Sequence, residues 1–437
     1  MFKNQKELIR NQIFTASFEQ RFFALYRKIF SIKEIEESSL LQWVFGATLF
    51  SFFITFQSWI GSSGITTEAF LNNDYVCWPW FQGCGEWYFL SALPYGYSQT
   101  IFYMAIFGAM VLITYLMWRR DWVLAHLLTT VLFLWKALVM LVLTYGMAGN
   151  YDYYHLVFAF VLLFLPLKIF FLKLTLVLFY FLASTIKFHE GWVLGTYFSA
   201  LKTGLPIFPD GTIPFWTNMV IFMQVIGSWF LLSSNKVLQR TALFFFVTFH
   251  LYSGTIVQFH YPAIVLPTLL ILFGPMYTHQ KVPLNKKAIA GWSLVAVLFI
   301  LQLSSVVIPG DEKITLEGNK YGLYMFEANH QCKSLVSIYD KEGEVYSFNR
   351  ESSLSRHRCD PYKLWFSVQQ ICKRSEDNID HVEIVFDHSI NGGPFYRIVD
   401  EQNACDLEYK ALQHNEWIKT PKEGAEIIGY PVKNIYR

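Results

Sequence analysis

Lys187 and the residues around it have the types and spacing needed for acid–base chemistry. The lysine ends an apolar run, LFYFLASTI, and begins a polar segment, KFHEGW. Removal from water favours the neutral amine, and a neutral lysine can act as a general base. Glu190, three residues further on, could instead share a helical face with Lys187 and stabilise the ammonium form. Two interpretations stay open: a catalytic base, or a structural lysine that is paired or reaches along an apolar surface toward water.

Histidines inside apolar runs are the second group of candidates. His250 lies in the middle of one run, and His260 lies about ten residues further on. A helix of that length spans roughly 15 Å, which is too far for two ligands of one metal ion. The chain also lacks CxxC spacing, so we expect no metal site. For His250, a structural role between packed helices remains an alternative to catalysis.

Long apolar segments up to about residue 308 must position these side chains. Hydrophobic residues make up 54% of the chain and charged residues 16%, below the roughly one quarter typical of soluble proteins. No nucleic-acid motif occurs, and we expect no nucleic-acid partner. A helix needs about 20 apolar residues to cross a lipid bilayer. Runs centred near residues 50, 109, 135, 163, 180, 224, 250, 270 and 298 therefore predict an all-α polytopic bundle of about nine transmembrane helices.

The basic residues give this predicted bundle an orientation. With a cytoplasmic N-terminus, Lys187 and Lys202 are the basic residues assigned to the outer side before residue 309. The others, apart from Lys136, fall in inner segments, as the positive-inside rule expects. We therefore expect an integral protein of the cell inner membrane. Its C-terminal part would be periplasmic, or lumenal in a eukaryote. Lys136 lies within an apolar run without an evident carboxylate partner, and we expect it to face a water-filled cavity.

The chain divides into three predicted parts. Residues 1–38 form a cytoplasmic segment whose amphipathic stretch, Ser17–Glu37, either lies on the membrane surface or packs on the inner loops. Residues 39–308 form the transmembrane domain. In residues 309–437, alternating segments such as SLVSIYD, VYSFN, HVEIVFDHSI and FYRIVD predict strands in hairpins, and PYKLWFSVQQICKR predicts a helix. This last part is expected to be a small extracytoplasmic α+β domain.

All six cysteines lie in segments assigned to the outer side. Cys77 and Cys84 form one group, and the terminal part holds the other four, Cys332, Cys359, Cys372 and Cys405. Both groups are even, which favours disulfides over free or metal-bound thiols in an oxidising compartment. The four terminal cysteines allow three pairings, between which the sequence does not choose.

Three stretches resemble the HTTM domain, a transmembrane module that includes the vitamin K-dependent γ-glutamyl carboxylases. They are, in chain order, YFLASTIKFHEGWVLGTY, TFHLYSGTIVQFHYPAIVLPTLLILF and HVEIVFDHSINGGPFYRIVD. The family's catalytic lysine stands five residues before a tryptophan, as Lys187 does before Trp192, and His250 matches the family's Phe-His position. The resemblance implies that Lys187 and His250 are catalytic. It implies cofactor binding by Tyr153, His155, Trp192 and His260.

The resemblance also implies a reaction. In the family, a lysine deprotonates a reduced quinone, such as vitamin K hydroquinone or a menaquinol, which reacts with oxygen and becomes a strong base. That base removes a γ-proton from a glutamyl side chain of a peptide or protein, and the carbanion takes up carbon dioxide. A cavity closed to water suits such chemistry. Two alternatives remain: a non-enzymatic membrane factor for maturation, immunity or secretion, and a quinone- or lipid-binding redox partner.

Overall fold

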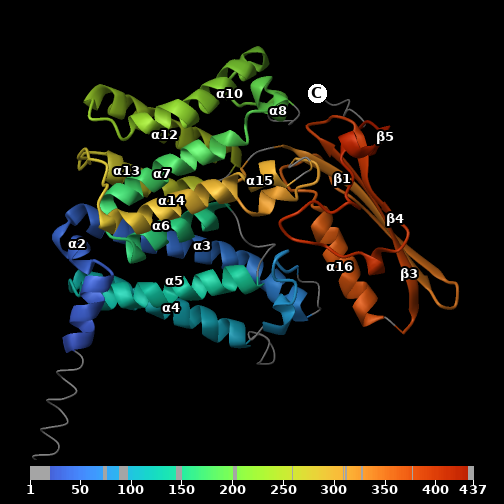
Figure 1. The fold of residues 1–437 in the computed structure, drawn as a ribbon, viewed down its shortest axis with the longest axis horizontal. Helices are drawn as coiled ribbons and strands as arrows, with labels where there is room; N and C mark the ends of the chain where they lie inside the picture. The colour runs from blue at the N-terminus through green and yellow to red at the C-terminus, as the bar shows by residue number, and fades with distance from the viewer. Residues whose placement is uncertain are drawn as a thin grey trace, which may run out of the picture.

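A bundle of helices and a five-stranded sheet lie side by side in this protein, and the sheet stands across one end of the bundle (Figure 1). The computed structural model describes residues 20–71, 76–87, 97–143, 150–199, 204–257, 259–308, 310, 313–325, 328–375 and 377–431. The bundle precedes residue 309, and the sheet follows it, close to the boundary expected from composition.

The bundle is built around one helix, α7 (Lys168–Thr185), which neighbouring elements surround. In chain order the helices are α2 (Ile32–Glu37), α3 (Ser39–Leu71), α4 (Tyr97–Trp118), α5 (Trp122–Leu143), α6 (Asn150–Phe164), α7, α8 (Glu190–Val193), α9 (Thr196–Ser199), α10 (Ile213–Phe222), α11 (Ser228–Phe230), α12 (Lys236–Val257), α13 (His260–Phe273), α14 (Ile289–Gln302) and α15 (Ser304–Val307). A π-helical turn, η5 (Met223–Gly227), joins α10 to α11. The short 3₁₀ turns are η1 (Cys84–Trp87), η4 (Asp210–Thr212), η6 (Lys286–Ala288), η7 (Gly318–Lys320), η8 (Ala404–Asp406) and η9 (Pro421–Glu423).

The prediction of an all-α bundle with nine transmembrane helices is wrong. In the described part of the chain, two helical segments, Lys168–Thr185 and Asp210–Phe230, are long and apolar enough to cross a membrane. Hydropathy does not distinguish a helix covered by protein from one covered by lipid. Of the Lys168–Thr185 segment, 83% is buried inside the molecule, as in the core helix of a soluble protein. Shorter apolar helices also occur: Ser39–Thr55, Tyr103–Trp118, Trp122–Leu138 and His260–Phe273.

One long apolar run is divided between two helices. The fourth and fifth expected spans are separated where α6 ends at Phe164 and Leu167 adopts a left-handed backbone conformation, with φ of 58°. The carboxylate of Glu34 accepts hydrogen bonds from the backbone N–H groups of Leu167 and Lys168, at 2.9 and 2.8 Å. This satisfies donors that the first turn of α7 leaves unpaired. An uninterrupted apolar sequence is thereby divided into helices of 15 and 18 residues.

The described N-terminal segment packs on the bundle. Residues 20–29 are helical, and Tyr26, Ile32 and Ile35 are buried. Tyr26 Oη lies 2.9 Å from Nδ1 of His126, whose Nε2 lies 3.0 Å from the Leu163 carbonyl oxygen. Of the two interpretations of Ser17–Glu37, packing on the protein is the one observed from residue 20 onward; residues 17–19 lie outside the described part.

The strands and helix expected after residue 309 are confirmed. The sheet contains β1 (His330–Asp340), β2 (Val345–Glu351), β3 (Ile379–Ile390), β4 (Phe395–Glu401) and β5 (Glu426–Gly429), in the order β2-β1-β3-β4-β5, with every pair antiparallel. α16 (Pro361–Arg374) begins with Asp360, whose side chain accepts a hydrogen bond from Tyr362 N, and with proline at its first position. Its apolar face, which includes Trp365, Phe366 and Val368, is buried.

The expected disulfides are present, and the structure selects one pairing. Cys77 bonds Cys84, Cys332 bonds Cys359, and Cys372 bonds Cys405. Disulfides together with two candidate membrane spans are typical of membrane or secreted proteins. The loop of the first disulfide lies against the terminal part: Tyr362 Oη donates to the Cys77 carbonyl oxygen at 2.8 Å, and Gln82 Nε2 donates to the Tyr409 carbonyl oxygen at 2.8 Å.

Candidate functional site

A cavity of about 470 Å³ lies between α7, the α10–η5 segment and α12. Its wall is mostly aromatic and aliphatic. Two lining side chains, Ile207 and Phe244, are 85% and 74% exposed, so the cavity opens onto an apolar part of the surface. The lining residues with polar or charged groups considered below are Tyr180, Lys187, Gln224, His250 and Arg356. Trp192 is an aromatic residue of the same wall.

Lys187 reaches this cavity because of its position relative to α7. Tyr180, Ala183 and Lys187 follow a spacing of three and four residues, which places them along one side of the helix and its end. Lys187 is only 2% exposed; its Nζ donates to the Ala183 carbonyl oxygen and lies 5.3 Å from the ring centroid of Trp192. The Glu190 residue is exposed. The amine therefore lies inside the protein, against an aromatic ring of the cavity wall.

His250 lies in the same cavity and is held by α7. It is 1% exposed, and its Nε2 lies 2.7 Å from Tyr180 Oη. The Tyr180 ring stacks on Phe246, with centroids 4.0 Å apart. Nδ1 of His250 is buried and has no hydrogen-bond partner in the described part of the protein. The imidazole is thus fixed on one side and has one nitrogen left for another group.

The structure brings together some of the residues expected to bind a cofactor and separates others. Trp192 lines the cavity with Lys187 and His250. Tyr153 is half-buried outside the cavity lining, with its ring 6.2 Å from that of the lining residue Phe179. His260 is exposed, and its ring stacks on Tyr151 at 6.2 Å.

His155 belongs to a second buried cluster around Lys136. Lys136 Nζ lies 2.9 Å from Asp152 Oδ1, 2.8 Å from Thr55 Oγ1 and 2.8 Å from His155 Nδ1. The expectation that Lys136 lacks a carboxylate partner is therefore wrong. The partner was missed because Asp152 lies near the start of the next helix and meets Lys136 only through packing of α5 against α6.

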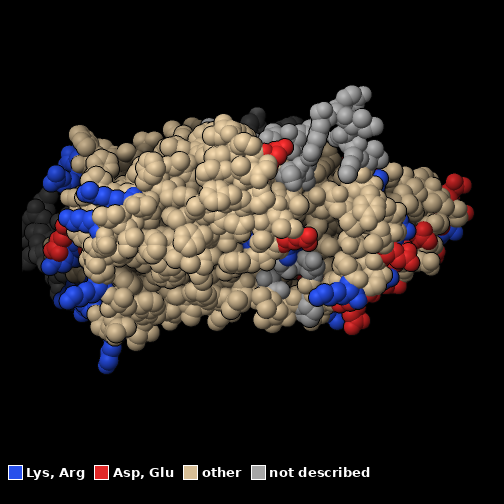
Figure 2. Space-filling model, turned by 90° about the horizontal axis from the view of Figure 1, so that it is seen from above, with Lys and Arg blue, Asp and Glu red and all other residues tan. Residues whose placement is uncertain are grey.

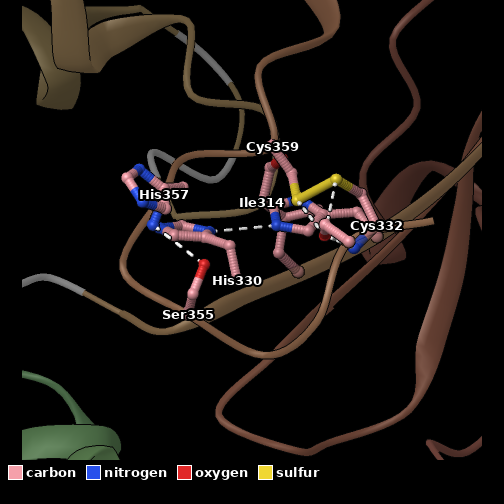
Figure 3. The surroundings of a disulfide bond; sticks show 8 residues. Ile314, His330, Cys332, Ser355, His357 and Cys359 are labelled. Atoms are coloured by element: carbon pink, nitrogen blue, oxygen red, sulfur yellow. Dashed lines mark hydrogen bonds between the residues drawn. A yellow bond between two sulfur atoms is a disulfide. The ribbon is translucent and has the colours of Figure 1, made fainter. Parts of the chain in front are cut away.

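Gln224 and Arg356 line the cavity but were not among the candidates. Gln224 interrupts the apolar run IFMQVIGSWF, and a search of such runs for uncharged polar residues as well as ionisable ones would have found it. Arg356 comes from the terminal part, in the loop between β2 and α16, and its Nη1 donates to the Ile256 carbonyl oxygen at 3.3 Å. The Cys332–Cys359 disulfide holds this loop beside His330 (Figure 3). No local sequence pattern predicts that contact.

Comparisons of the chain with protein-family models, with curated proteins and with solved structures find no match. The described residues contain no group of three or more His, Cys, Asp or Glu side chains that could hold a metal ion.

The residues present do fit a reduced quinone. Aromatic and aliphatic walls suit its ring, and two buried atoms without partners among the described residues, His250 Nδ1 and Gln224 Oε1, suit its hydroxyl groups. The site thus combines an apolar chamber with a small number of polar groups.

Proposed function

We propose that this protein is a membrane-associated enzyme that uses a reduced quinone, bound in the cavity around Lys187, to carboxylate glutamyl side chains. The observation that carries the proposal is that the buried amine of Lys187 and the imidazole of His250 line one apolar cavity. A peptide-binding factor without catalysis would not require a buried amine there. The resemblance to the carboxylase family supplies the type of reaction.

Lys187, His250 and Arg356 of the cavity each have a task in this proposal. Lys187 takes a proton from a ring hydroxyl at Nζ, and the Trp192 ring beside it limits access of water. His250, fixed through Nε2 by Tyr180, orients the ring through Nδ1. The bound quinol, on oxidation by oxygen, supplies the strong base needed to remove a γ-proton before carbon dioxide is added. Arg356, from the terminal part, binds the carboxylate of the glutamyl side chain.

The proposal places the helical bundle in contact with lipid. Figure 2 shows Lys and Arg gathered at the end of the bundle that lies away from the sheet, with an uncharged face between that end and the sheet. Large apolar side chains are exposed on several helices: Met104, Trp118, Leu134, Phe244, Leu251 and Ile300. Such a surface suits a bilayer, from which an apolar quinol could enter beside Phe244. We place the basic end in the cytoplasm and the sheet in the periplasm, or in the lumen of a eukaryote.

A second candidate function, peptide binding without catalysis, is favoured by the edge of the sheet. All seven residues of β2 are exposed, and β2 is the outermost strand next to β1. An extended peptide can add to such an edge through main-chain hydrogen bonds. In the enzymatic proposal the same edge would present the substrate peptide.

Incorporation of labelled carbon dioxide into a glutamyl peptide tests the proposal. The purified protein would be assayed with vitamin K hydroquinone or a menaquinol under air. The matched variants are Lys187→Met and Lys173→Met, because Lys173 is a buried lysine within α7, the helix that leads to Lys187, but lies outside the cavity and donates to the Thr278 carbonyl oxygen. We expect labelling by the wild type, a loss of about 100-fold or more in Lys187→Met and little change in Lys173→Met.

Two results would contradict the enzymatic proposal. One is the absence of labelling by folded wild-type protein with every quinol. The other is equal labelling by the two lysine variants. Binding of the same peptide by a protein that never labels it would favour the second candidate instead.

A further inference from the structure

Gln224 is a buried polar residue whose side-chain oxygen has no hydrogen-bond partner among the described residues. The residue is 4% exposed and lines the cavity that holds Lys187 and His250. A buried acceptor that makes no hydrogen bond is unfavourable, and native proteins rarely keep one without a reason. The amide oxygen therefore points to a hydrogen-bond donor on whatever occupies the cavity.

The backbone around Gln224 is also unusual. Gln224 is the second residue of η5, a π-helical turn that interrupts the helical segment Asp210–Phe230. The wider turn changes the direction in which side chains leave the helix, and such turns are frequent at functional sites. η5 packs against α7, so Gln224 enters the cavity from the wall that faces the helix carrying Tyr180 and leading to Lys187.

His250 adds a second buried polar atom without a partner among the described residues to the same chamber. Its Nε2 shares a hydrogen bond with Tyr180 Oη, and its Nδ1 is buried without a partner in the described part of the chain. When Nε2 carries the proton and donates to Tyr180, Nδ1 is left as an acceptor. Gln224 Oε1 and His250 Nδ1 then both require donors, whereas most of the remaining cavity wall is apolar.

We propose that Gln224 is a specificity-determining residue that selects the hydroxyl form of an aromatic ligand over a form without hydroxyl donors. This inference rests on the proposed function, because it concerns the quinol in the same cavity. A hydroquinone ring has hydroxyl groups that donate to Gln224 Oε1, whereas a quinone or an ether offers acceptors alone. The preference follows because the wrong ligand leaves the buried amide oxygen unpaired.

Binding of two matched probes tests the inference without any turnover. The probes are 2-methyl-1,4-naphthohydroquinone and its 1,4-dimethyl ether, which keeps the ring and both oxygens but cannot donate. Dissociation constants would be measured without oxygen by quenching of tryptophan fluorescence, because Trp192 and Trp216 line the cavity. The variants are Gln224→Met, which keeps the side-chain length, and Val220→Ala, which changes an apolar lining residue one turn away.

We expect wild-type protein and Val220→Ala to bind the hydroquinone about tenfold more tightly than the ether, and Gln224→Met to bind the two about equally. A ratio near one in the wild type overturns the inference, as does a ratio unchanged in Gln224→Met or no binding of either probe. The wild-type ratio serves as a test even where Gln224→Met does not fold. If the wild type prefers the hydroquinone to the ether but carboxylates no peptide, the proposed function alone is contradicted. If it carboxylates a peptide but binds the two probes equally, the role of Gln224 alone is contradicted.

Discussion

Tyr180 Oη and His250 Nε2 lie 2.7 Å apart, and both side chains are buried. The bond joins α7, which leads to Lys187, to α12, which carries His250. The two residues expected to do the chemistry are therefore held in one cavity by a contact between residues 70 positions apart in the sequence. The orientation of the imidazole depends on this tyrosine hydroxyl.

Replacing Tyr180 with Phe should weaken ligand binding as well as stability. The change removes the hydroxyl, keeps the ring that stacks on Phe246, and leaves His250 Nε2 buried without its partner. We expect a loss of about 1–3 kcal/mol in the free energy of unfolding. A suitable control is Tyr154→Phe, because Tyr154 Oη bonds Thr268 at 2.6 Å and the residue lies outside the cavity. Both variants should lower the melting temperature, but hydroquinone binding should weaken in Tyr180→Phe alone; equal binding in the two would contradict this role.

Removal of one partner from the Lys136–Asp152 pair should destabilise the protein more than removal of both. Their side chains are 6% and 0% exposed, so either variant, Lys136→Met or Asp152→Leu, leaves a charge buried. We expect the free energy of unfolding to fall by about 3–5 kcal/mol in each single variant and by less in the double variant. A double-mutant cycle from denaturant unfolding measures the coupling. Additive losses would show that the pair contributes no interaction.

Loss of the Cys332–Cys359 disulfide should affect both stability and the cavity. The bond closes a loop of 27 residues, and its replacement by two serines should cost about 3–4 kcal/mol. The same loop carries Arg356 to the cavity, so binding of a glutamyl peptide should weaken as well. The double serine variant of Cys77 and Cys84, whose loop spans seven residues, should cost about 2 kcal/mol and leave peptide binding close to wild type. Equal effects on binding would argue against a role for the loop.

Stability should fall in mild acid because of His388 in the sheet. Burial lowers the pKa of His388 to about 4, while its hydrogen bond to the Ile314 carbonyl oxygen acts in the opposite direction. The unfolded chain binds a proton below about pH 6.5, whereas the folded protein keeps this ring neutral down to about pH 4. The contribution of His388 to the free energy of unfolding is therefore fully present above pH 6.5, and it decreases by about 3 kcal/mol as the pH falls to 4.

The variant His388→Asn isolates this contribution, because an asparagine amide can replace the Nδ1–H donor without titrating. Denaturant unfolding at pH 7.5 and at pH 4.5 gives, for each protein, the difference in the free energy of unfolding between the two pH values. The difference should be smaller in His388→Asn than in the wild type. Identical differences would rule out titration of His388 as a cause.

The terminal part could be predicted closely from sequence because its signals are local. Alternation of apolar and polar residues marks β1 to β4, and Asp360 followed by Pro361 marks the start of α16. Even numbers of cysteines predicted disulfides, but their pairing depends on which strand and loop meet in space. The bundle was predicted less well, since an apolar run has the same sequence signal whether protein or lipid covers it.

The sequence by itself determined which residues could do chemistry: a lysine at the end of an apolar run and a histidine within another are unusual wherever the chain places them. The tertiary structure decided which of them meet. Lys187, Trp192 and His250 share a cavity, His155 belongs to the Lys136 cluster, and His260 is exposed. The physical reason is that side-chain hydrogen bonds and packing join helices far apart in the chain, and spacing along one helix carries no information about its neighbours.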